Sequence, residues 1–147
     1  MKYFVLLMYA MGLFLIPTAT AYNRYYSGTI NLTMVYNVVN SIPREYFSNL
    51  GSLTISEGNC IINGTRKAYE GYYYYSYRIE HIFGLRIYGY VSKADIWVCN
   101  LGERRYDEDY FKETLLHEIG HHFQMNVLKQ FDNLSEEYAE EFVKSFG

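Results

Sequence analysis

The sequence has little of several features that mark particular protein classes. It contains two prolines and two cysteines in 147 residues, and the cysteines lack the close C-x-x-C spacing of a zinc knuckle. It shows no internal repeat and no linker, so we expect one domain and not a repeat protein. The net charge of −3 gives no basic surface, so we expect neither nucleic acid nor an anionic membrane as a partner.

No apolar run is long enough to span a membrane. The longest, FVLLMYAMGLFLI at residues 4–16, falls short of the about 20 residues that a spanning helix needs. It follows the positive charge of Lys2 and precedes PTATA, which ends at Ala21. This order is typical of a secretory signal peptide. We therefore expect residues 1–21 to be removed, leaving residues 22–147 as a secreted or cell-surface domain without stable membrane insertion.

The two cysteines and three asparagines fit an exported chain. An even cysteine count outside the cytosol predicts a disulfide, here between Cys60 and Cys99. The alternative, a pair of thiolate zinc ligands, agrees less well with their spacing and with export. Asn31, Asn63 and Asn133 each begin an N-x-S/T triplet and are candidate glycosylation sites.

The first two-thirds of the domain have the composition of strands. Residues 27–39 alternate apolar and polar side chains and predict a strand, and Pro43 predicts the first turn of a short helix. Two short β-prone runs around Glu57-Gly58-Asn59 predict a hairpin. Residues 69–91 are β-prone throughout, with their glycines as turns or bulges, and residues 94–100 predict a buried strand.

The last third changes to helical periodicity. Residues 101–132 lack proline and carry apolar side chains every four or so positions. Acidic residues at 107–109 suit the start of this helix. Residues 133–147 predict a second helix, capped by Asn133 or Ser135. A β-rich part followed by two helices predicts an α+β domain.

The segment His117-Glu118-Ile119-Gly120-His121 is an HExxH motif within the first of these helices. Side chains four residues apart share a helix face, so His117 and His121 can reach one metal ion. Imidazole is substantially unprotonated at neutral pH and is a good zinc ligand. Glu118 lies one step round the helix, where it can take a proton from a water at the metal. Gly120 is costly inside a helix, which indicates a close neighbour there.

The motif needs a third protein ligand. The metzincin pattern requires a glycine and a histidine where this chain has Gln124 and Val127, so that class is excluded. His122 points about 100° away from His121 and is expected at the rim of the site, behind a ligand, or exposed. His81 lies far upstream and is expected to be structural. The glutamates of the last helix remain as candidates.

The stretch SEEYAEEF at residues 135–142 resembles the E-x-x-A motif that follows HExxH in gluzincin metallopeptidases, including ImmA/IrrE-like and HtpX-like catalytic cores. The resemblance implies a small zincin-like fold and one zinc ion (Zn²⁺) per chain. It gives Glu136 as third ligand, Ala139 as the small residue where two helices approach, and Glu140 as partner of a ligand imidazole. Glu137 is the alternative ligand. The strand at 94–100 resembles the edge strand of a zincin substrate cleft.

These patterns together predict a secreted zinc-dependent metalloendopeptidase that hydrolyses a peptide or protein substrate, with Glu118 as general base. Tyr138 and the tyrosines of residues 72–77 are candidate donors to the oxyanion of the transition state. The alternative is an exported, tyrosine-rich zinc-binding or adhesion module without turnover. The 18 tyrosines fit that alternative, but it leaves the glutamate of HExxH without a role.

Overall fold

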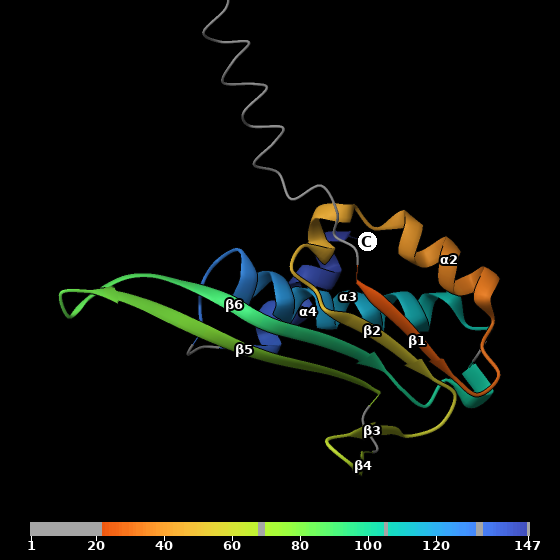
Figure 1. Cartoon of the computed structure of the whole chain (residues 1–147). Coiled ribbons are helices and arrows are strands. Elements are labelled where there is room, and N and C mark those ends of the chain that lie inside the picture. The colour runs from red at the N-terminus through yellow and green to blue at the C-terminus, as the bar shows by residue number, and fades with distance from the viewer. Residues whose placement is uncertain (1–21, 68–69, 105, 132–133, 147) are drawn as a thin grey trace, which may run out of the picture.

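The computed structural model describes residues 22–67, 70–104, 106–131 and 134–146, which form a mixed domain of helices and strands (Figure 1). This agrees with the predicted mixture of α and β elements. The predicted signal peptide, residues 1–21, lies outside the described residues. Within the described part of the chain, no helix is long and apolar enough to cross a membrane. The elements in chain order are β1 (Asn23–Ser27), α2 (Leu32–Ser41), η1 (Arg44–Phe47), β2 (Ser52–Ser56), β3 (Cys60–Ile62), β4 (Thr65–Lys67), β5 (Gly71–Ile82), β6 (Leu85–Val98), η2 (Gly102–Arg104), α3 (Glu108–Asn126) and α4 (Glu136–Phe146).

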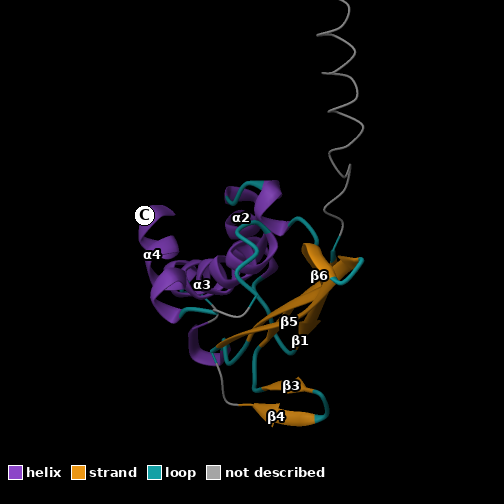
Figure 2. Ribbon diagram, turned by 90° about the vertical axis from the view of Figure 1, so that its left-hand side faces the viewer, coloured by secondary structure: helices purple, strands orange, loops and turns teal. Residues whose placement is uncertain are grey.

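The helices and the main sheet form two layers (Figure 2). The sheet has the strand order β1-β2-β6-β5, in which β1, β2 and β6 are parallel and β5 is antiparallel to β6 at the edge. The core lies between the layers, where Leu115 and Ile119 of α3 are fully buried in one cluster with Ile55 and Ile96 of the sheet. Strands β3 and β4 form a separate small hairpin.

The strand predicted at residues 27–39 is wrong. Strand β1 ends at Ser27, and helix α2 follows. The Asn31 side chain caps this helix by accepting a hydrogen bond from the Met34 backbone N–H at 3.2 Å. Valines occur in both strands and buried helix faces, so their presence disguised the helical spacing. The buried residues of α2 do fall on one helical face: Met34, Val35, Val38 and Val39.

The hairpin predicted around Glu57-Gly58-Asn59 is also wrong, although both of its strands form. Strand β2 lies in the main sheet between β1 and β6, and β3 pairs with β4. Distant backbone groups bind the connection: Glu57 N donates to Ser27 O at 2.9 Å, and Gly102 N donates to Glu57 O at 2.9 Å. Parallel pairing joins strands that are far apart in the sequence and therefore leaves no local signal.

Within the β-prone stretch predicted at residues 69–91, residues 71–82 form β5 and residues 85–91 are part of β6, and a tight turn joins the two at Gly84 as predicted. The two bulges of this pairing fall at positions without glycine. The buried strand predicted at 94–100 is the end of β6. It lies between β2 and β5, so it is not an edge strand, and β5 occupies that edge instead.

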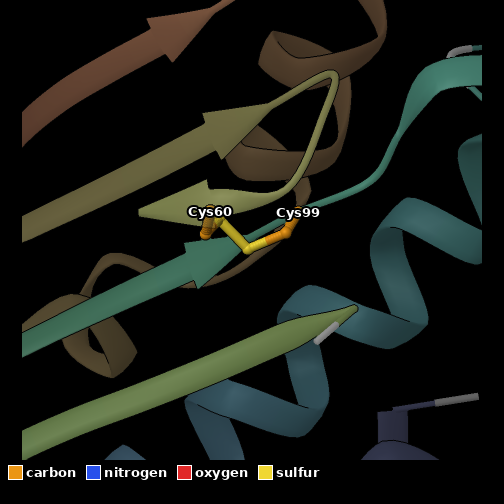
Figure 3. Close-up of a disulfide and its surroundings, with 2 residues drawn as sticks. All are labelled: Cys60 and Cys99. Carbon is orange, nitrogen blue, oxygen red and sulfur yellow. A yellow bond between two sulfur atoms is a disulfide. The ribbon is translucent and has the colours of Figure 1, made fainter. Parts of the chain in front are cut away.

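The predicted disulfide joins Cys60 in β3 to Cys99, just after β6 (Figure 3). The two Cα atoms are 5.4 Å apart, and both residues are buried. Since 39 positions separate the two cysteines in sequence, the bond ties the β3–β4 hairpin to a distant part of the chain.

The three candidate glycosylation sites lie in different surroundings. Asn63 is exposed in the turn between β3 and β4, whereas Asn31 is half-buried as the cap of α2. Asn133 lies outside the described residues. Glycosylation therefore stays a prediction, with Asn63 as the most accessible of the two described sites.

Candidate metal centre

Helix α3 carries the HExxH motif and is fixed at its start and along one side. Asp107 caps it, because Asp107 Oδ1 accepts a hydrogen bond from Tyr110 N at 3.0 Å. Phe111, Leu115 and Ile119 are fully buried in the core. These side chains prevent rotation of the helix about its axis, so the polar side of the motif has one fixed direction.

Helix α4 contacts α3 at Gly120. A Cβ atom at this position would lie 3.1 Å from Ala139 Cα and 3.1 Å from Phe142 Cβ. A glycine facing an alanine therefore allows the two helices to touch, as expected for both positions. The contact places the first turn of α4, with Glu136, beside the histidines of α3.

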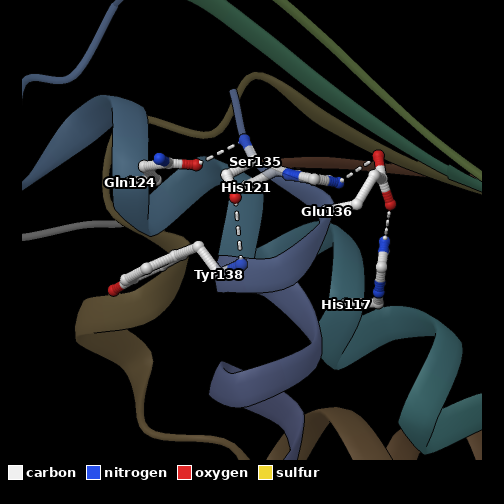
Figure 4. Close-up of polar contacts among 6 residues, drawn as sticks. All are labelled: His117, His121, Gln124, Ser135, Glu136 and Tyr138. Atoms are coloured by element: carbon white, nitrogen blue, oxygen red, sulfur yellow. Dashed lines mark hydrogen bonds and ion pairs between the residues drawn. The ribbon is translucent and has the colours of Figure 1, made fainter. Parts of the chain in front are cut away.

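His117, His121 and Glu136 converge from the two helices (Figure 4). Glu136 Oε2 lies 2.8 Å from His117 Nε2, and Glu136 Oε1 lies 3.2 Å from His121 Nε2. One ligand atom from each residue lies within 4.8 Å of the other two. Glu137 is exposed and does not belong to this group. Of the two glutamates considered from the sequence, the structure therefore brings Glu136 to the histidines.

The spacing of these atoms fits a zinc ion. Ligand atoms around a tetrahedral zinc lie about 3.4 Å apart when the bonds are about 2.1 Å long. The two histidine–glutamate contacts, at 2.8 and 3.2 Å, lie close to that separation. The Glu136 side chain is 73% exposed, so the group opens to solvent on that side. An open side next to three protein ligands is the arrangement that a catalytic zinc requires.

Glu118 lies next to this group and is 6% exposed. Gly71, the first residue of β5, makes room for it, since a Cβ there would collide with the Glu118 carboxylate. Gly71 is therefore neither the turn nor the bulge that the sequence predicted. Its actual role is to let the edge strand pass close to the carboxylate.

Burial raises the pKa of Glu118 to about 8, and the negative charge of Glu136 adds to the shift. A cation held by His117, His121 and Glu136 would act on this pKa in the opposite direction. Burial lowers the pKa of His121, so its imidazole is neutral at neutral pH. A neutral imidazole is the form that binds metal.

Of the two ring nitrogens of His121, Nε2 contacts Glu136, whereas Nδ1 lacks a partner in the described part of the chain. His121 Nδ1 is buried and lacks a hydrogen-bond partner among the described residues. Glu140, expected to serve a ligand imidazole, is exposed and lines the cleft without bonding this atom. The resemblance to gluzincins implies that Glu140 bonds a ligand imidazole, but no contact between Glu140 and His121 supports that role.

His122 is neither exposed nor part of the site. It is 1% exposed, lies about 100° round α3 from His121, and does not line the cleft that contains His117 and His121. Its Nε2 donates to Ser48 O at 2.7 Å, and its Nδ1 accepts from the Tyr73 hydroxyl at 2.8 Å. The carbonyl can only accept, which fixes this neutral tautomer. His81 is exposed near the end of β5.

Gln124 holds the start of α4 and was not recognised from the sequence as part of the site. It is 1% exposed, and its Oε1 accepts a hydrogen bond from Ser135 N at 3.0 Å. Its Nε2 donates to Gln130 Oε1 at 2.9 Å. Ser135 in turn caps α4, because its hydroxyl accepts from Tyr138 N at 3.2 Å (Figure 4). Since Glu136 follows Ser135 directly, Gln124 fixes the backbone that carries the third ligand.

His117, His121 and Glu136 line a cleft of about 910 Å³. The start of β5 forms one wall, with Gly71, Tyr72 and Tyr73, and α3 and α4 form the others. Tyr73 already donates its hydroxyl to His122, and Tyr138 packs on Phe142 and is not a lining residue. Tyr110, which no sequence motif assigned to the site, lines the cleft from the same face of α3 as His117.

Comparison of the chain with protein-family models, curated proteins and solved structures found no match. The functional interpretation therefore depends on the residues of this cleft and on the HExxH and E-x-x-A motifs.

Proposed function

We propose that the protein is a zinc-dependent peptidase of gluzincin type, in which His117, His121 and Glu136 bind the metal and Glu118 is the general base. One observation carries this proposal. Two Nε2 atoms and a carboxylate from separate helices meet within 4.8 Å, and the carboxylate that follows the first histidine is buried beside them. A structural metal site needs the three ligands but has no need of that fourth group.

The residues have distinct tasks in this reaction. A zinc ion held here would supply a Lewis acid for a water molecule and for the substrate carbonyl. Glu118 takes the proton of the attacking water and returns it to the leaving amine. Burial of Glu118 keeps bulk water from competing for that proton. His117 and His121 ligate in the neutral form.

The substrate class follows from the cleft and from the motif. The cleft is large enough for several residues of an extended chain and is open along α4. Its lining includes tyrosines at 72, 73 and 110 as well as the carboxylates of Glu70, Glu113 and Glu140. These features support a peptide with apolar and basic side chains as the substrate, and the zincin-like resemblance agrees with peptide hydrolysis.

Metal content and cleavage measured together test the proposal. We expect one zinc per chain in the wild type and in Glu118→Gln, and cleavage of a diverse peptide library by the wild type alone. A wild type that holds one zinc and cleaves nothing would favour the exported, tyrosine-rich zinc-binding module. A wild type that binds no zinc would refute both accounts.

A further inference from the structure

Strands β5 and β6 continue beyond the main sheet as a two-stranded arm. Strand β2 pairs with β6 only at residues 95–98, whereas β5 and β6 pair with each other from Gly71 to the turn. Residues 77–91, called the arm below, therefore have no third strand among the described residues. Figure 1 shows the arm as the long ribbon that projects from the body of the domain.

The tip of the arm exposes large apolar side chains. Phe83 is 100% exposed, and its neighbours Ile82 and Leu85 are 55% and 68% exposed. No described part of the protein covers Phe83, and more than half of Ile82 and of Leu85 is exposed. Their exposure is unfavourable in water, so a partner that covers them would be stabilised by the hydrophobic effect.

Phe83 also occupies an unfavourable backbone conformation. Phe83 and Gly84 have φ angles of 53° and 76°, the positive values of a two-residue hairpin turn. The same chain makes a matching turn between β3 and β4 with Asn63 and Gly64, at φ 52° and 75°. Asn-Gly is the favoured pair for this turn, and a bulky side chain at positive φ is strained. The aromatic ring at the tip is therefore not explained by the turn.

The charged and aromatic side chains behind the tip suit a lipid surface. Arg86 is exposed directly behind the tip, where it pairs with His81, and Arg78 is exposed further back, opposite Tyr90. Glu80 is the one acidic residue of the arm. Tyr88 is 56% exposed and stacks on Tyr90. An apolar tip backed by exposed arginines and tyrosines suits a bilayer, where apolar side chains enter the acyl region and arginines and tyrosines lie at the headgroups. The net negative charge of the whole chain hides this local basic excess.

We propose that the arm docks the protein reversibly on an anionic lipid bilayer, with Phe83, Ile82 and Leu85 inserted and Arg78 and Arg86 on headgroup phosphates. A protein partner fits the tip less well, because a stable interface needs about 800 Å² from each side and the tip is only two strands wide. A bilayer needs no matching shape. The inference is independent of the proposed peptidase activity.

Vesicle cosedimentation of the purified chain tests the proposal. The probes are vesicles of phosphatidylcholine alone and vesicles with about one-third phosphatidylserine. We expect binding to the anionic vesicles that weakens with salt. Phe83→Asn should weaken it at least tenfold, while the thermal midpoint stays or rises because the tip becomes an Asn-Gly turn. Arg78→Gln with Arg86→Gln should remove the preference for anionic lipid.

The control is Ile61→Asn, which removes another exposed apolar side chain, 64% exposed on β3, from a position away from the arm. It should bind vesicles as the wild type does. All variants share one N-terminus, so the residues before Tyr22 do not affect the comparison. The proposal is overturned if the wild type does not bind anionic vesicles, or if the Phe83→Asn protein binds them as well as the wild type does. A wild-type dimer that Phe83→Asn converts to a monomer also overturns it, because the tip would then be a self-association surface.

Discussion

The two polar sides of helix α3 differ in how their buried groups are satisfied. On the side toward the core, both ring nitrogens of His122 are bonded, one to Tyr73 and one to Ser48. On the side toward the cleft, His121 has a buried nitrogen without a partner among the described residues, and burial raises the pKa of Glu118. Of these two adjacent histidines, His122 therefore has partners at both ring nitrogens, whereas His121 has a buried nitrogen without one in the described part of the chain.

This difference separates structural from functional polar groups. A buried polar group without a partner destabilises the fold by about 1–3 kcal/mol, so an unneeded one is readily lost. Buried polar groups without a hydrogen-bond partner persist mainly where a ligand or a reaction uses them. The core side of α3 therefore stabilises the protein, and the cleft side is where we expect function. Each side makes its own experimental prediction.

The largest effect should come from Glu118→Gln. The substitution keeps the shape of the side chain and removes its basicity, so we expect kcat for peptide cleavage to fall by about 10²–10⁴. The zinc content should stay at one per chain, since no ligand is changed. Kinetics and metal analysis of the same preparation measure both. Equal cleavage rates in variant and wild type would mean that another group is the base.

Next comes Glu136→Ala, with Glu137→Ala as its matched control. Loss of residues behind a ligand typically costs 10- to 100-fold in metal affinity, so loss of the ligand itself should exceed about 100-fold. Zinc competition with a fluorescent chelator measures this. Glu137 is exposed outside the group, so its variant should bind as the wild type does. The reverse result would place the third ligand one residue later.

Gln124 allows a finer test on the same helix. Gln124→Met removes the hydrogen bonds that the buried amide makes to Ser135 and Gln130, and should weaken zinc binding about 10-fold. Gln124→Glu keeps an acceptor for Ser135 N and should recover most of the affinity. The Co²⁺-substituted absorption spectrum reports whether the geometry changes as well. If Gln124→Met destabilises the fold but leaves zinc affinity intact, the residue stabilises the loop without positioning the ligand.

The sequence predicted the parts of the site that local periodicity encodes. Helices α3 and α4 have regular apolar spacing and acidic or hydroxyl caps, so their positions followed from neighbouring residues. The same periodicity placed the HExxH motif and Gly120 within one helix. Glu136 came from the E-x-x-A resemblance, because spacing alone does not distinguish it from Glu137.

Long-range contacts could not be predicted in the same way. The parallel pairing of β2 with β6, the partners of His122 and the passage of Gly71 beside Glu118 all join segments more than 40 residues apart. The prediction for the residues of helix α2 failed for a different reason, since their valines suit a strand equally well. In each case the tertiary partner, and not the local sequence, determines the structure.

Tyr73 contacts both histidines, since its ring stacks on His121 and its hydroxyl bonds His122. Tyr73→Phe keeps the ring, so it should reduce stability without affecting metal binding. The ring stays in place, but His122 Nδ1 loses its buried donor, which should lower the free energy of unfolding by about 1–3 kcal/mol. Urea denaturation measures this, and zinc affinity should match the wild type. A normal unfolding curve combined with weaker zinc binding would show that the two sides of α3 are not independent.

The smallest effect concerns the pH dependence of stability. Burial lowers the pKa of His122 below its ordinary value of 6.5. Between these two values the unfolded chain binds a proton at this residue and the folded chain does not, so stability rises with pH and is lost as pH falls below 6.5. His122→Gln keeps a donor for Ser48 and an acceptor for Tyr73 but cannot titrate. In the metal-free protein its unfolding free energy should therefore depend on pH less steeply than that of the wild type, by up to about 1.4 kcal/mol per pH unit. His121 and Glu118 titrate in both proteins, so the difference between the two slopes isolates His122. Parallel slopes from pH 5 to 6.5 would show that this imidazole takes up its proton in the folded protein as readily as in the unfolded one.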